Sequence, residues 1–198
     1  TGSPHLPVRI HLVLPPATYH GFSVVIATAD GKFMEKSTDK QLTVGRSSLT
    51  KAGTFEFEAN LVPVNLSETG TSNCYIVPEA GLYSFDATVI GDGFGIIPDS
   101  DFHTDDPHID PASAELLWEE SESVVTCVNY NDGYISFLSN GLKGNALIGA
   151  KDADGQILWS WHIWGTDLPK EETYVNSTGT YQVLDRNLGA TRADRGTG

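Results

Sequence analysis

The chain of 198 residues carries 26 acidic and 12 basic side chains, which gives a formal net charge of -14. Nucleic acids and anionic lipid surfaces would repel such a chain, so we exclude both as partners. Hydrophobic residues make up 39% and charged residues 19% of the chain, a composition typical of a folded protein and not of a disordered tail.

Alternation of apolar residues with a period of two dominates the first third of the chain and predicts strands. We expect them at 8–14, 21–28, 32–38, 41–44 and 54–61. The pair Asp30-Gly31 supplies the positive φ angles of a two-residue hairpin turn, so it should join the second of these strands to the third. Proline and small polar residues at 62–70 predict a linker.

A second series of strands is expected after residue 72, at 73–77, 81–90, 124–130, 134–138, 145–150, 156–164 and 180–184. Between them, residues 91–111 are rich in aspartate and predict a long acidic loop. Residues 112–120 fit either one helical turn or a strand, and we expect Leu116, Leu117 and Trp118 to anchor this segment to a core.

Short strands at this spacing, separated by turn signals, favour a sandwich over alternating strands and helices. We therefore predict an all-β protein with two immunoglobulin-like β-sandwich modules in tandem. The first would span residues 1–64, and the second residues 65–198. About 64 residues are few for a fold that normally needs about a hundred, so the first module can be only part of a domain.

Cys74 and Cys127 match no zinc-binding spacing. One interpretation is a disulfide in an exported protein, and the other is a pair of buried thiols. The sequence leaves both open because it does not report the distance between the two Cα atoms. No apolar run approaches the roughly 20 residues that span a bilayer, so we expect no direct membrane insertion, and we expect the natural protein to continue at both ends.

The segment 158–164 is the most aromatic of the chain. In a strand, Trp159 and Trp161 share one face, whereas His162 and Trp164 share the other. Exposed tryptophan rings can stack on sugars, so these four residues are candidate ligand-binding residues for a carbohydrate. We favour the alternative, in which one face fills the core and the other packs beneath a loop, because large aromatic side chains usually serve core packing. His162 would then be a structural residue and not a base.

Oxygen ligands in the acidic loop suit calcium, and His103 and His108 lie near several of its aspartates. The spacing fits no known calcium loop, and a zinc site would need further ligands at fixed geometry. We therefore favour a solvated, mobile loop, with no metal and no cofactor.

The charged run Asp185-Arg186-Asn187 follows the last expected strand. We interpret it as an Asp–Arg pair that fixes the turn between modules, with the planar guanidinium satisfying carbonyls or a carboxylate. The chain has no nucleophile elbow and no phosphate-cradling glycine loop between a strand and a helix. These observations predict a protein that is not an enzyme.

Four stretches, 72–77, 144–148, 151–164 and 181–190, resemble a module common in surface proteins of the Bacteroides-type fimbrillin family. Residues 1–60 are similar to the closing half of a fimbrillin-like domain, through their alternating strands, the Asp30-Gly31 hairpin and residues 45–48. In many relatives the stretch that resembles 184–190 leads into a further domain similar to C-type-lectin-like folds.

The resemblance implies a β-sandwich protein exported to the cell outer membrane surface from a lipid-anchored precursor. It implies a fimbrillin-like adhesin or pilus component that mediates attachment or assembly by β-strand exchange. The partners would be other pilus or surface subunits, or host or bacterial surface ligands, including glycans. Two alternatives are a carbohydrate-binding surface module and an accessory fragment of a larger enzyme whose catalytic part lies beyond Gly198.

Overall fold

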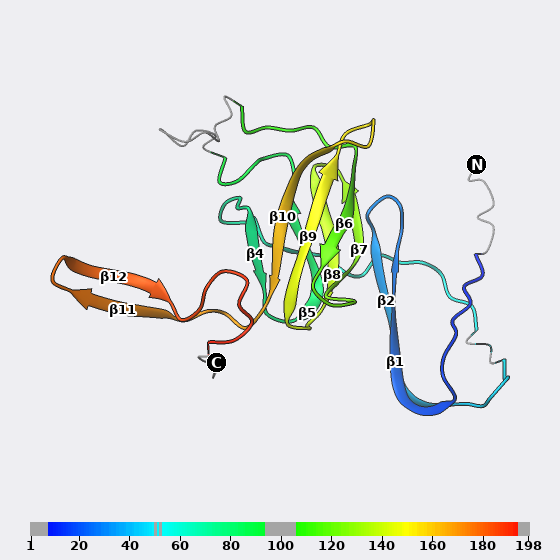
Figure 1. Ribbon diagram of the computed structural model, residues 1–198. Helices are drawn as coiled ribbons and strands as arrows, with labels where there is room; N and C mark the ends of the chain where they lie inside the picture. The colour runs from blue at the N-terminus through cyan, green and yellow to red at the C-terminus, as the bar shows by residue number, and fades with distance from the viewer. Residues whose placement is uncertain (1–7, 50, 52, 94–105, 194–198) are drawn as a thin grey trace. The chain divides into compact units, whose positions relative to one another are not determined.

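The computed structural model describes residues 8–49, 51, 53–93 and 106–193, and every regular element in these ranges is a β-strand (Figure 1). The protein is thus all-β, as predicted. Contacts divide the chain into two units, of which the first comprises residues 1–26 and 33–60 and the second residues 27–32 and 61–198. The described ranges hold no helix that could cross a membrane.

The first unit is built on strands β1 (Ala17–Ala27) and β2 (Phe33–Val44), which form a two-stranded sheet. The predicted hairpin is present, and Gly31 in its turn has a φ of 73°, whereas Asp30 has no positive φ. Thr28 N donates to Lys32 O (2.9 Å) and Gly31 N to Thr28 O (3.0 Å), so the turn is longer than the predicted two residues. The two strands expected at 32–38 and 41–44 are one continuous strand. The strands predicted at 8–14 and 54–61 are wrong. Residues 8–14 are exposed and have no regular strand pairing. Residues 54–60 form no strand and contact β2 through isolated hydrogen bonds, such as the bond from Asn60 N to Phe33 O (3.1 Å).

The two-layer sandwich predicted for residues 1–64 does not form in the described part of this unit. Only one sheet is present there. Among those side chains Phe33 and Met34 are the buried hydrophobic ones. The short segment lacks the residues for the second sheet of an immunoglobulin-like sandwich.

The second unit contains two four-stranded sheets that enclose one core (Figure 1). The first, here called the β10 sheet, has the order β4 (Cys74–Val77), β10 (Ile157–Gly165), β9 (Gly144–Lys151) and β6 (Ser113–Glu119). The second, the β8 sheet, has the order β3 (Val64–Asn65), β5 (Ala80–Asp86), β8 (Tyr134–Asn140) and β7 (Val125–Asn131). Residues 112–120 thus contribute a strand and not a helical turn.

The predicted linker at 62–70 is part of this sandwich. β3 pairs in parallel with β5, and Leu66 packs against the core. The larger part of the second unit therefore begins at Leu61, before the predicted boundary at residue 65. The sequence pattern did not predict the two-residue strand β3, because residues 62–70 have the composition of a turn.

Aromatic rings from both sheets meet at the centre of the core. The ring of Phe85 lies 4.9 Å from that of Tyr75, 5.1 Å from that of Trp161 and 6.3 Å from that of Phe137. Phe85, Phe137 and Trp161 are each 0% exposed. Each such aromatic pair adds about 0.5–1.5 kcal/mol beyond the burial of apolar surface, so these contacts hold the sheets together.

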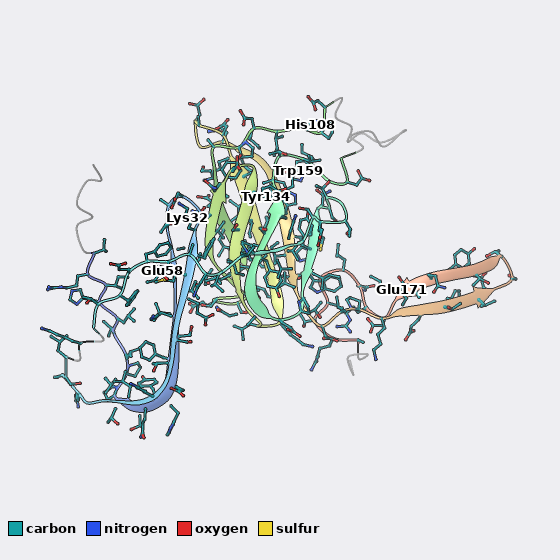
Figure 2. The ribbon with its side chains drawn as sticks, turned by 180° about the vertical axis from the view of Figure 1, so that it is seen from behind. Lys32, Glu58, His108, Tyr134, Trp159 and Glu171 are labelled. Carbon is teal, nitrogen blue, oxygen red and sulfur yellow. The ribbon has the colours of Figure 1, made fainter. Side chains whose placement is uncertain are left out.

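The predicted final strand is present as β12 (Gly179–Leu184), and it pairs antiparallel with a strand that the sequence pattern did not reveal, β11 (Glu171–Asn176). Every residue of both strands is exposed. Figure 2 shows side chains leaving both faces of this ribbon from Glu171 onward. The hairpin thus has no covering layer among the described residues.

Candidate functional site

The outer face of the β10 sheet gathers the polar side chains that the sequence singled out. Trp161 and Ile163 of β10 point into the core, so His162 between them and Trp164 after them point to the other side of the sheet. The register places His162 beside Cys74 of β4 and Leu147 of β9, and Trp164 beside Asn145 of β9. This outer face and the chain 185–191 that contacts it form the candidate site.

The aromatic strand leaves little for a sugar to contact. Trp161 is 0% and Trp164 1% exposed, so neither ring presents a face to a ligand. Trp159 is half-buried, packs against the core, and donates from Nε1 to Asn73 Oδ1 (2.9 Å). Trp164 donates from Nε1 to Ala190 O (3.2 Å), and the chain 185–191 is thus tied to the outer face.

Trp118, expected to anchor β6 to the core, is 55% exposed. The pairing of β6 with β9 is irregular between Leu116 and Trp118, where Leu116 lies opposite Ile148 and Trp118 opposite Leu147. A bulge of this kind inserts one residue and reverses the alternation that follows. Trp118 therefore shares the outer face with Leu147, whereas strict alternation would place it beside Leu116 in the core.

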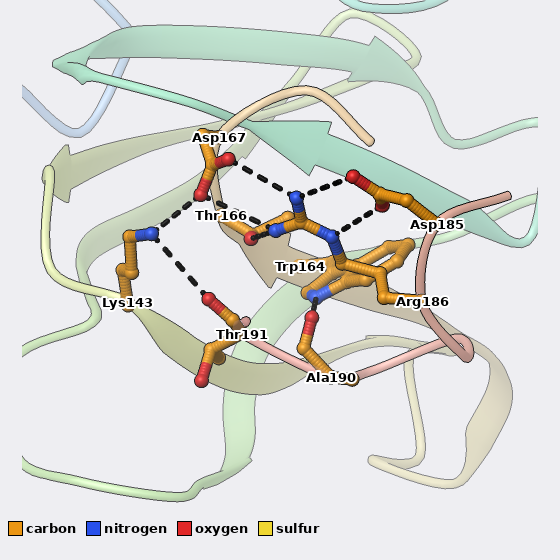
Figure 3. A network of polar contacts seen from close by, with 8 residues as sticks. All are labelled: Lys143, Trp164, Thr166, Asp167, Asp185, Arg186, Ala190 and Thr191. Atoms are coloured by element: carbon orange, nitrogen blue, oxygen red, sulfur yellow. Dashed lines mark hydrogen bonds and ion pairs between the residues drawn. The ribbon is translucent and has the colours of Figure 1, made fainter. Parts of the chain in front are cut away.

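Arg186 is the centre of a polar network at the edge of this face (Figure 3). Its side chain, 4% exposed, donates to both carboxylate oxygens of Asp185 at 2.7 and 3.1 Å and to both of Asp167 at 3.3 and 3.1 Å. A further bond of 3.0 Å reaches Thr166 Oγ1. The planar guanidinium makes two bidentate pairs at once, which fixes the chain after β12 to the end of β10.

Lys143 extends the network from the loop before β9. Its ammonium group pairs with Asp167 and donates to Thr191 O (3.4 Å). The Arg186 guanidinium and the Lys143 ammonium hold the pKa of Asp167 well below its usual range. Arg186 likewise lowers the pKa of Asp185, so both carboxylates stay ionised at neutral pH and the network carries balanced charge.

Cys74, His162 and Asn145 form a second network on the same face. Cys74 Sγ lies 3.2 Å from His162 Nδ1, and His162 Nε2 lies 2.8 Å from Asn145 Oδ1. Burial raises the pKa of the Cys74 thiol to about 11 and lowers the pKa of His162. At neutral pH the network therefore holds a neutral thiol beside a neutral imidazole.

The two cysteines are free thiols, so the disulfide interpretation does not hold in this structure. Cys74 lies on β4 of the β10 sheet and Cys127 on β7 of the β8 sheet. The alternative of two buried thiols does not hold either, because Cys127 is exposed and Cys74 half-buried. Cys127 has a φ of 53° and sits in a pairing irregularity, which no strand pattern reveals.

The acidic loop lies largely outside the described residues, including His103. Its last part returns to the sandwich, where His108 bridges Val89 and pairs with Asp106 at an exposed position. No group of three or more metal-ligating side chains gathers in the described ranges.

No family model, no curated protein and no solved structure matches this chain.

Proposed function

We propose that the protein is a non-enzymatic cell-surface subunit, a fimbrillin-like adhesin or pilus component that assembles through β-strand pairing. The observation that carries the proposal is the β11–β12 hairpin, whose twelve residues are all exposed. An isolated two-stranded hairpin is at best marginally stable in water. A partner strand or surface would cover this ribbon in the assembled state.

The strand orders support the immunoglobulin-like part of this proposal. The order β5-β8-β7 in one sheet and β6-β9-β10 in the other corresponds to the B-E-D and C-F-G orders of immunoglobulin-like sandwiches. Such modules are common in cell-surface proteins. An exported, surface-anchored setting agrees with this architecture and with the resemblance to fimbrillins.

The side chains of the hairpin show what a partner would contact. Tyr174 lies directly opposite Tyr181, and Glu172 opposite Val183, so one face carries a tyrosine pair beside an apolar residue. The two tyrosines are 56% and 45% exposed. Exposed aromatic side chains with open strand edges suit a partner that adds a strand and packs side chains over it.

To test the proposal, cells that display the protein are sheared, and the released material is separated by unheated detergent electrophoresis and probed with an antibody to this chain. We expect a ladder of detergent-resistant multiples. The double variant Tyr174→Thr/Tyr181→Thr places β-branched residues, which suit strands, at both positions. It should lower the amount of multimer at least about tenfold, as expected for the loss of a few kcal/mol of binding free energy at the contact. A single monomer band from the parent chain would contradict the proposal.

The matched control is Tyr134→Thr, because Tyr134 is also an exposed tyrosine (41%) in a strand but lies on β8 of the sandwich (Figure 2). This control should leave the ladder unchanged. Equal effects of the two replacements would place the contact outside the hairpin.

A further inference from the structure

The Cys74–His162–Asn145 network has a defined direction of hydrogen bonding. Asn145 donates from Nδ2 to Glu120 Oε2 (2.7 Å) and to Gly189 O (3.0 Å). Its Oδ1 is therefore the atom that faces His162, and a carbonyl oxygen only accepts. His162 must carry its proton on Nε2, which leaves the Nδ1 lone pair pointing at the Cys74 thiol, 3.2 Å away.

The surroundings of His162 keep this arrangement neutral. Cys74 faces it from β4, Asn145 from β9, and the Trp164 ring stacks on it with centroids 6.5 Å apart. The carboxylate of Glu120 lies behind Asn145 and is engaged by its amide. The carboxylate of Glu120 is thus separated from the ring by the side chain of Asn145.

We propose that Cys74 is a nucleophilic thiol that exchanges with disulfides, with His162 as its general base and Asn145 as the positioning residue. The same three residue types, with histidine between cysteine and asparagine in the hydrogen-bonded network, form the nucleophile, base and orienting group of papain-like proteases. Cys74 would thus be a covalent attachment site, a function beyond the proposed role in assembly.

The exchange passes one proton through His162. His162 Nδ1 takes the proton from Cys74 Sγ, and Sγ attacks one sulfur of the incoming disulfide. A new sulfur–sulfur bond forms and the original one breaks, so Cys74 is oxidised and the departing half is reduced. The imidazolium then returns the proton to the departing thiolate, which leaves as a thiol.

Disulfides suit this site better than acyl compounds. Acyl transfer needs preorganised donors for an oxyanion in addition to a nucleophile and a base. The backbone N–H of Cys74 already donates to Ser72 Oγ (3.3 Å). Attack on a disulfide needs a deprotonated thiol and a leaving sulfur in line, and Cys74 is a half-buried thiol on β4, an edge strand of its sheet.

The test uses the full chain with Cys127→Ser, which leaves Cys74 as its single thiol, and the aromatic disulfide dithiobis-nitrobenzoate as the probe. At about pH 7 we expect the folded protein to react about 10²-fold faster than the Cys127→Ser/His162→Gln variant, the usual contribution of a general base. Equal rates in the two folded proteins would overturn the proposal. So would a Cys74 that reacts only after unfolding in urea.

The pH profile of the Cys127→Ser chain gives a second readout that does not depend on the His162 variant folding. The rate should rise through the pKa of His162, which burial places below the ordinary 6.5, and then stay level. It should rise again toward the thiol pKa of about 11. The control, Cys74→Ser, leaves the exposed Cys127 and measures its separate contribution to the rate. A Cys74 profile without a level region would refute the role of His162.

Discussion

Arg186 shows how much of this structure depends on the shape of one side chain. It makes five hydrogen bonds to three residues, Asp185, Asp167 and Thr166. The sequence predicts an Asp185–Arg186 pair that fixes the turn between modules, and the two bonds between these side chains show the pair itself. The second carboxylate, from Asp167, lies 19 residues earlier and could not be assigned from the sequence.

Arg186→Lys should lower the urea midpoint of unfolding. Lysine keeps the positive charge but is a point charge, so it cannot make two bidentate pairs. Equilibrium unfolding followed by tryptophan fluorescence measures the change. The control Arg46→Lys, at an exposed position of the first unit, should leave the midpoint unchanged. Equal midpoints for Arg186→Lys and the parent would mean that charge alone holds the chain after β12.

Trp161 should separate the effects of volume and of hydrogen bonding in the core. Trp161→Ala leaves a large cavity and should cost about 3–5 kcal/mol in the free energy of unfolding. Trp161→Phe should cost less than about half of that, since it also removes a buried Nε1–H that has no partner among the described residues. Urea unfolding at neutral pH measures both. A similar cost for the two variants would show that the N–H is satisfied, for example by water.

At the scale of elements, the close approach of strand ends constrains the sandwich as strongly as its core does. A Cβ atom on Gly165, the last residue of β10, would lie 2.5 Å from Leu142 O and 3.2 Å from Gly144 O. Both are backbone atoms and cannot rotate away. Glycine at this position lets the loop before β9 pass close to β10.

Gly165→Ala should therefore destabilise the second unit by about 1–3 kcal/mol, the usual cost of overpacking. The control is Gly45→Ala, where the nearest atoms to an added Cβ lie at 3.7 Å and beyond. Thermal unfolding of both variants would measure the difference. An unchanged melting temperature for Gly165→Ala would mean that the loop at Leu142 moves freely.

Strands were the elements that the sequence predicted best, and their irregularities the ones it missed. Alternation located β5, β8, β9 and β10 because each has one face in the core. The bulge before Trp118 and the two-residue β3 left no periodic signal, since alternation needs several regular residues. Strand β11 was missed because neither of its faces is buried, so no apolar pattern marks it.

At the scale of the whole molecule, the ionised carboxylates of the Arg186 network predict how stability depends on pH. The pKa values of Asp167 and Asp185 in the folded chain lie below the ordinary 3.8. A lowered folded pKa means that the stabilisation is fully present above the unfolded value and is lost as pH falls through the folded values.

The urea midpoint should therefore be level at mildly acidic pH and decrease below about pH 4. In Arg186→Lys the decrease should be smaller, because the lysine lowers the two carboxylate pKa values less. Unfolding curves recorded at a series of pH values measure both slopes. Parallel curves for the two proteins would assign the acid sensitivity to other carboxylates.

The sequence by itself determined the all-β class, most strands of the second unit, the Asp30-Gly31 turn and the Asp185–Arg186 pair. These features depend on residues close together in the chain, through alternation, turn chemistry and charge. Only the tertiary structure decided that Trp161 and Trp164 are buried while Trp118 is exposed. It also decided that Cys74 contacts His162, 88 residues away, and that His162 contacts Asn145. Strand order and register bring such residues together, and both arise from packing between sheets, for which a local pattern carries no signal.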